Sequence, residues 1–85
     1  MTARNGWEAM HRALKVDRLV AAAVRVAQGR GITDPVRIAE AAARWTDQHW
    51  AALKSVAPGV KHMPSATTRA AVIERLRERA KGAAA

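Results

Sequence analysis

Helix-breaking signals divide this chain of 85 residues into three segments, and no other feature restricts the possible folds as strongly. Residues 29–31 read Gly-Arg-Gly, and Gly29 can take the left-handed conformation that closes a helix ending at Gln28. Asp34 and Pro35 form a helix start, because aspartate accepts from the free amides of the first turn and proline lacks an amide that would stay unpaired. The stretch 58–64 begins and ends with proline and reads as a loop.

The three segments are rich in Ala, Arg, Leu and Glu, which favour helix, and they lack the alternation of apolar and polar residues that is typical of strands. We predict an all-α fold, a three-helix bundle with helices at about 6–28, 35–56 and 65–81, in one small basic domain over residues 1–85. Short connections between long helices favour antiparallel neighbours.

Each predicted helix carries one arc of apolar residues at helical spacing, and we expect the three arcs to form the core. In the first helix the arc consists of Met10, Ala13, Leu14, Val16, Val20, Ala21, Val24 and Ala27. In the second it consists of Ile38, Ala42, Trp45, His49, Leu53 and Val56, and in the third of Ala66, Ala70, Ile73, Leu76 and Ala80. The core is expected to be thin, because half of the hydrophobic residues are Ala and the chain has no Phe or Tyr.

Two charged residues interrupt these arcs. Asp17 falls inside the arc of the first helix, and Arg69 falls inside that of the third. An unpaired buried charge is costly, so we predict an ion pair between Asp17 and Arg69 that fixes the register of the two helices. His49 is expected to be a hydrogen-bonded core histidine rather than a ligand.

The net charge of +8 is unevenly distributed along the chain. Residues 1–33 carry six cations and two anions, residues 34–57 three of each, and residues 58–85 six and two. A neutral central helix between two basic ones predicts a basic surface, which is the electrostatic footprint of a polyanion. Eleven arginines against four lysines, with abundant alanine, are also what the codon usage of a GC-rich genome produces, so part of the charge has a compositional explanation.

A row of cations lies opposite the apolar arc of the first helix. His11, Lys15, Arg18 and Arg25 follow one another at spacings of four, three and seven residues, with Arg12 beside them. Such a row can follow the phosphates of a nucleic acid, and each contact releases counterions. The alternative is the solvated polar face that any surface helix has.

The third helix offers a second row, formed by Arg75 and Arg79. We predict an anion site at the start of this helix, where free amides attract negative charge, and it consists of Lys61, His62, Ser65 and Thr68. The alternative is that Ser65 only caps the helix and the loop only connects. The Gly-Arg-Gly sequence at 29–31 lacks the strand and the further glycines of a nucleotide-binding motif, and we interpret it as a turn.

Three apolar residues indicate a possible protein contact. Trp7 opens the first helix beside the cationic row, where it can stack on a base, anchor a partner or simply pack as a staple. Leu19 and Val26 lie seven residues apart on the otherwise polar side of the same helix. This repeat predicts a small contact strip that suits a protein partner or a homo-oligomer better than DNA.

Several functional classes are disfavoured by what the chain lacks. It has no cysteine, and its three histidines share no spacing of four residues, so we expect no disulfide, no metal site and no cofactor. No nucleophile with a nearby base can be assembled, and we expect no enzymatic activity. The longest uninterrupted apolar run, residues 19–24, is far shorter than a membrane span of about 20 residues, and we expect a cytoplasmic protein.

The leading hypothesis is a nucleic-acid-associated module that contacts DNA or RNA phosphates through the rows on the first and third helices. The alternative is a small protein-interaction module, such as a phage-encoded or bacterial accessory modulator of a host protein, or an assembly component.

Overall fold

A computed structural model describes residues 2–57 and 66–84, apart from the side chains of residues 2–12 and of residue 54. Within these ranges all regular structure is helical, which confirms the all-α prediction. The helices are α1 (Thr2–Gly29), α2 (Pro35–Gln48), α3 (Trp50–Val56) and α4 (Ala66–Ala84). The segment predicted as one helix at 35–56 is thus two helices, and the described part of the chain holds four helices rather than three.

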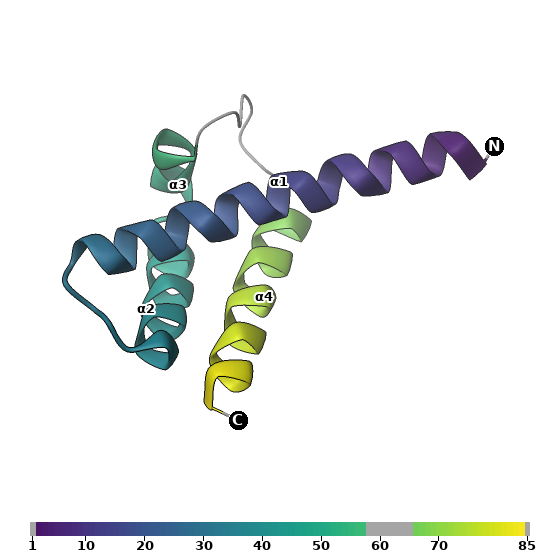
Figure 1. Ribbon diagram of the computed structural model, residues 1–85. Helices are drawn as coiled ribbons and strands as arrows, with labels where there is room; N and C mark the ends of the chain where they lie inside the picture. The colour runs from purple at the N-terminus through teal and green to yellow at the C-terminus, as the bar shows by residue number, and fades with distance from the viewer. Residues whose placement is uncertain (1, 58–65, 85) are drawn as a thin grey trace.

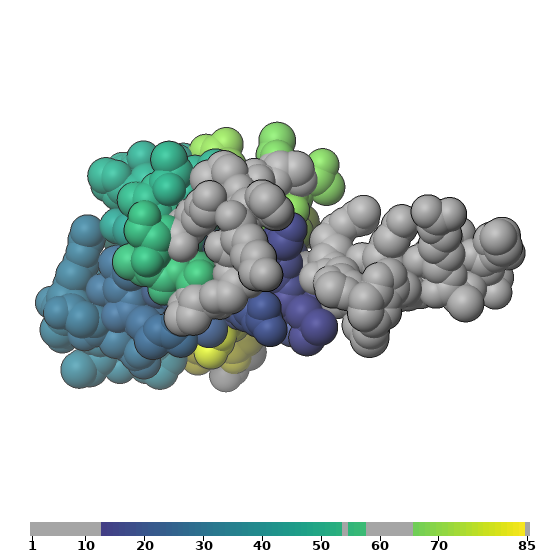
Figure 2. Space-filling model, turned by 90° about the horizontal axis from the view of Figure 1, so that it is seen from above, coloured from purple at the N-terminus to yellow at the C-terminus, as the bar shows by residue number. Residues whose placement is uncertain are grey.

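The helices form two layers. Helices α2 and α4 lie side by side and run in opposite directions, with the most extensive contact between any two helices, and α1 lies across both (Figure 1). The short α3 lies beside α1 (Figure 2). At a rise of about 1.5 Å per residue, α1 is roughly 40 Å long, close to the 45 Å longest dimension of the molecule. The predicted arrangement of three antiparallel neighbours is not confirmed, because α1 crosses the other two.

The core lies where α1 crosses the α2–α4 pair. Its fully buried large side chains come from all four helices: Leu19, Thr46, Leu53, Val72 and Leu76. Alanines on the facing surfaces, among them Ala23 and Ala42, allow the helix backbones to approach closely. Burying one leucine side chain in this way stabilises the fold by about 1.5–3 kcal/mol, so a few such residues must carry most of the stability.

The buried face of α1 is rotated from the predicted arc. Leu19 is completely buried, whereas Leu14, predicted to be in the core, is 49% exposed. Ala13 is exposed as well. Residues 19–24 are all apolar, so periodicity does not determine which side of this stretch faces inward. Among the described side chains of α1, burial begins at Val16, because only the second half of the helix crosses α2 and α4.

The turn between α1 and α2 follows the sequence closely. Asp34 caps α2 as predicted, with its Oδ2 accepting from the Arg37 amide at 3.0 Å, and Pro35 takes the first helical position. The glycine with positive φ is Gly31, at +87°, whereas Gly29 still belongs to α1. The prediction that Gly29 takes the left-handed conformation is therefore wrong: α1 continues one residue beyond Gln28, and the left-handed position falls two residues after Gly29.

The break between α2 and α3 falls at His49, which has φ −127° and ψ 41°. Its amide donates to the Trp45 carbonyl at 2.8 Å, and its own carbonyl accepts from Leu53 at 3.2 Å, so it ends one helix and begins the next. The buried Thr46 also donates its Oγ1 to the Ala42 carbonyl at 2.8 Å, a bond that tends to bend helices. The break directs Leu53 into the core.

His49 itself is exposed, which contradicts its prediction as a core histidine. Its ring lies 5.8 Å from that of Trp45, tilted by 41°. Trp45 is half-buried and packs against the core, as does Trp50. The indole of Trp45 therefore separates the imidazole from the interior.

Helix α4 also turns a different face inward. Its buried residues are Thr68, Val72 and Leu76, of which only Leu76 belongs to the predicted arc. Ala66 and Ala70 are exposed. Burying the larger Val72 removes more apolar surface from water than burying an alanine, so packing overrides a periodicity based largely on Ala.

Within residues 13–57 and 66–84, ion pairs connect α1 with α4 and α2 with α4, and neither is the predicted one. Asp17 of α1 pairs with Arg75 of α4, and Arg69 of α4 pairs with Asp47 of α2. Arg69 also donates to the Asp47 carbonyl at 3.1 Å. The prediction that Asp17 and Arg69 pair with each other is wrong, because Asp17 lies on the α1 side of α4 and Arg69 on the α2 side. All four side chains remain about half exposed, so these pairs orient the helices more than they stabilise them.

In the part of the chain that the structure describes, no helix combines the length and the apolar character needed to span a bilayer.

Candidate polyanion-binding surface

The outer side of α1 carries exposed arginines above the two-helix layer. Arg18 and Arg25 are both exposed and lie two helical turns apart, and Lys15 is half-buried at the edge of this side. Asp17, the one acid among the described side chains of α1, is paired with Arg75. We call the exposed side marked by Arg18 and Arg25 the α1 crest.

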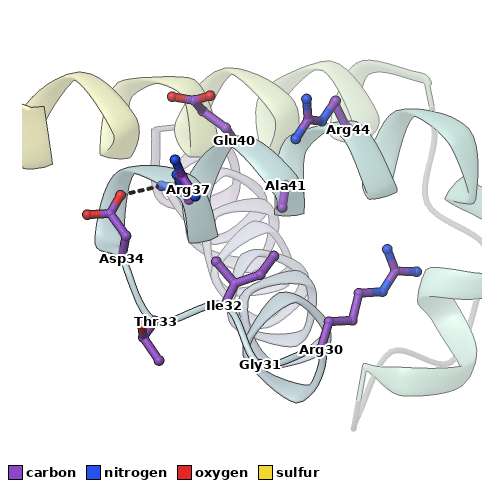
Figure 3. A pocket seen from close by; sticks show the side chains of 9 residues that line it. All are labelled: Arg30, Gly31, Ile32, Thr33, Asp34, Arg37, Glu40, Ala41 and Arg44. Carbon is purple, nitrogen blue, oxygen red and sulfur yellow. Dashed lines mark hydrogen bonds between the residues drawn. The ribbon is translucent and has the colours of Figure 1, made fainter.

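Beyond the end of the crest, the turn into α2 forms a hollow of about 540 Å³ (Figure 3). We call it the corner hollow. Arg30 enters from the turn, and Arg37 and Arg44 come from α2 about two helical turns apart, so that the three arginines surround Ile32 and Ala41. The half-buried Ile32 packs against the core and gives this part of the hollow a fixed apolar wall.

The helix start explains why these arginines are held together. The Asp34 cap and Pro35 fix the first turn of α2, and the chain turns at Gly31, so that Arg30 lies across the hollow from that first turn (Figure 3). Arg37 and Arg44 are seven residues apart and therefore lie on one side of α2. The residues that form the turn and the start of α2 therefore also place the arginines around one hollow.

The corner hollow also contains two acids. Asp34 is engaged by its capping bond to the Arg37 amide, the dashed line in Figure 3. Glu40 lies between Arg37 and Arg44 along α2. The hollow keeps an excess of one positive charge, and no ion pair within the described ranges engages the guanidinium groups of Arg30, Arg37 or Arg44.

Guanidinium groups in this setting are suited to oxyanions. Each presents a planar fork of donors that matches a phosphate or carboxylate, and exposed arginines lose little solvation when they bind. Arg25 is exposed and lies one turn before the end of α1, so the arginines continue from the crest into the hollow. An extended polyanion can contact crest and hollow together, whereas a small anion can contact only one.

The predicted second row on the third helix is only partly available. Arg75 is paired with Asp17, so this guanidinium already has an anionic partner. Arg79 is exposed and lines a separate hollow of about 320 Å³ with Val24 and Gln28 of α1. Both arginines therefore lie along the flank of α1 rather than on a face remote from it.

Other predicted residues are buried or fall outside the description. Thr68 is buried, which places its hydroxyl in the interior and not at an anion site on the surface. The remaining predicted members of that site, Lys61, His62 and Ser65, lie outside the described residues, and the side chains of Trp7, His11 and Arg12 do too.

The predicted contact strip on α1 does not form. Leu19 is completely buried and Val26 is half-buried, so these two side chains do not present an apolar strip to a partner. The reason is the rotation of the buried face of α1, which brings Leu19 into the core. Leu14 and Val56 are instead the large hydrophobic side chains that stay exposed in the described part of the chain.

The corner hollow was not predicted from the sequence. Residues 29–31 were interpreted only as a turn and the second helix as neutral, although that helix contains Arg37 and Arg44 at a spacing of seven. The signal was present in this spacing and in the arginine between the two glycines. Net charge per segment concealed it, because three acids balance three cations over residues 34–57 while Arg30 is counted with the preceding segment.

Among the described residues, no three His, Asp or Glu side chains come together as metal ligands would. No protein-family model, curated protein or solved structure matches this chain.

Proposed function

We propose that this protein is a non-enzymatic nucleic-acid-associated module that binds the phosphate backbone of DNA or RNA through the α1 crest and the corner hollow. The observation that carries the proposal is the set of exposed arginines at the end of α1 and around the following turn: Arg25 on the crest, and Arg30 and Arg37 in the corner hollow. Within the described residues, no ion pair neutralises any of them.

The arrangement supports backbone binding rather than reading of bases. The arginines lie on an outer edge, spaced along a helix and around a turn, where they can meet successive phosphates. Contacts to phosphate fix the position of a protein on nucleic acid without carrying sequence information. We therefore expect Arg18, Arg25, Arg30 and Arg37 to contribute most of the affinity, with Lys15 and Arg79 at the periphery and little preference among sequences.

The proposal is tested by neutralising the corner. We expect the double variant Arg30→Gln, Arg37→Gln to bind a fluorescein-labelled duplex of random sequence about tenfold more weakly than the wild type at roughly 50 mM salt. Glutamine preserves side-chain length and helix propensity, so the change removes charge with little effect on folding. Fluorescence anisotropy measures the affinity.

The matched control is Arg77→Gln, Lys81→Gln, which removes the same charge from exposed positions on α4. It should lose less than about threefold, since Arg77 and Lys81 line the hollow along α4 and line neither the crest nor the corner hollow. All variants are compared at protein concentrations at which each sediments as a monomer, so that self-association does not contribute to the measured affinity. Equal losses in both variants would show that binding follows net charge alone, and the assigned surface would then be wrong.

A further inference from the structure

Helix α1 covers one side of the α2–α4 pair and leaves the other side open (Figure 1). Two shallow hollows of about 540 and 260 Å³ mark this open face. The larger lies along α4 and the smaller between α2 and α4, and Arg77 lines both, so the hollows adjoin. No helix in the described part of the chain lies over this face.

Apolar side chains occupy the part of the open face near the start of α4. Ile73 of α4 is half-buried, Ala66 and Ala70 beside it are exposed, and Ala43 contributes from α2. Ala66, Ala70 and Ile73 belong to the arc that the periodicity of this helix predicts for the core. In the folded chain these three side chains stay outside the core, where Thr68, Val72 and Leu76 are the buried residues of α4.

The charges of the open face differ from those of the rest of the molecule. The residues lining the two hollows include four cations and four anions, so the face is neutral on a chain of net charge +8. Two copies of the chain repel each other at the crest and at the corner, but not here. A neutral face is thus the side on which a second copy can approach.

The sequence of charges along α4 is complementary to its own reverse. The order is Glu74, Arg77, Glu78, Lys81. When two copies of α4 pack in opposite directions around a two-fold axis, Glu74 meets Lys81 of the second copy and Arg77 meets Glu78 of the second copy. A two-fold axis makes every such contact occur twice, so all eight charges find an opposite partner.

From these observations we propose that the open face is a dimer interface, with a second copy of this chain as its occupant. This inference goes beyond nucleic-acid binding and does not depend on it. In such a dimer the α1 crest of each copy stays on the outside, and the corner hollow borders the interface, because Glu40 and Arg44 line both it and the smaller hollow of the open face.

The paired length of α4 sets the size of the interface. With Glu74 against Lys81 and Arg77 against Glu78, the two copies of α4 overlap over residues 71–84, a length of about 21 Å, and two adjacent helices are about 20 Å wide, which gives roughly 400 Å² for each copy. The total of about 800 Å² places the dimer among weak, transient contacts.

Sedimentation equilibrium of the full chain without nucleic acid, at about 5 to 500 μM and 0.15 M salt, tests this. The average mass should rise from 9.2 kDa toward twice that value across the range. We would make two double variants: one combines Glu74→Lys with Glu78→Lys, and the other combines Arg77→Glu with Lys81→Glu. Each should raise the dissociation constant of the dimer at least tenfold, because like charges then face each other. An equimolar mixture of the two variants should associate again, since the reversed charges complement one another.

The control is Arg18→Glu, Arg25→Glu, which makes the same change in charge as Arg77→Glu, Lys81→Glu, but on the α1 crest, and should leave self-association unchanged within about twofold. Circular dichroism confirms that each variant keeps its helical content. A mass that stays at 9.2 kDa at every concentration overturns the proposal and leaves the face to a different partner. So does a mixture that fails to restore association, because self-complementary charge is the basis of the inference.

Discussion

Leu14 and Leu19 show that the burial of a leucine depends on which side of the helix it occupies. Both are leucines of α1, five residues apart, yet Leu19 is completely buried and Leu14 is 49% exposed. The sequence favours the opposite assignment, because Leu14 shares an arc with Val16 and Val20 while Leu19 lies beside the cations Lys15 and Arg18. The crossing of α2 and α4 beneath α1 selects the side that contains Leu19.

Truncating these two leucines should therefore have very different effects. We expect Leu19→Ala to lower the free energy of unfolding by about 2–5 kcal/mol, since it leaves a cavity where the helix layers meet. Leu14→Ala should change it by less than about 0.5 kcal/mol. Urea unfolding followed by circular dichroism measures both, and equal effects would mean that the buried face of α1 is assigned wrongly.

Asp34 has a structural role although it lies in the corner hollow. Its carboxylate accepts from the Arg37 amide, so Asp34→Ala should lower the free energy of unfolding by about 1 kcal/mol, while Asp34→Asn retains most of the cap. Thermal unfolding measures this difference. Nucleic-acid affinity should not fall in Asp34→Ala, because the change removes a negative charge from beside the arginines. A loss of affinity without a loss of stability would contradict this division of roles.

At the scale of the helices, the ends were more predictable than the faces. The start of α2 at Pro35 follows from capping chemistry that acts over four residues, and the structure has that chemistry. The break between α2 and α3 at His49 could not be predicted, because no proline or glycine marks it in the sequence. The break is stabilised by the burial of Leu53 in the core, and that burial depends on residues far away in the sequence. The buried faces of α1 and α4 were predicted wrongly for a related reason. An alanine-rich helix has apolar residues on more than one side, and the packing of the other helices decides which side is buried.

The ion pairs between helices give a prediction at the same scale. A double-mutant cycle on Asp17 and Arg75, with alanine at each position, should yield a coupling free energy of about 0.2–1 kcal/mol, as expected for half-exposed pairs. The same cycle on Asp17 and Arg69 should yield a value within about 0.3 kcal/mol of zero, because these residues have other partners. Chemical denaturation provides the four free energies of each cycle. Stronger coupling between Asp17 and Arg69 would contradict the helix arrangement.

At the scale of the whole molecule, the fold separates charge by face. The crest and the corner gather arginines, while the face of α2 and α4 away from α1 is neutral. Sequence reasoning correctly predicted that Arg18 and Arg25 lie on an exposed side of the first helix. The clustering of Arg30, Arg37 and Arg44 was not predicted. These residues come from a turn and from a helix, and the relative placement of the two depends on how α1 crosses α2.

Salt dependence tests the proposed function most directly. We would measure fluorescence anisotropy of the wild-type protein with a random-sequence DNA duplex and with single-stranded RNA, from about 20 to 200 mM salt. The account predicts binding tighter than about 10 μM at low salt, with log affinity falling linearly against log salt at a slope near −3 to −4 for the duplex, as about four neutralised phosphates require. No binding at about 20 mM salt, or an affinity that does not change with salt, would contradict it.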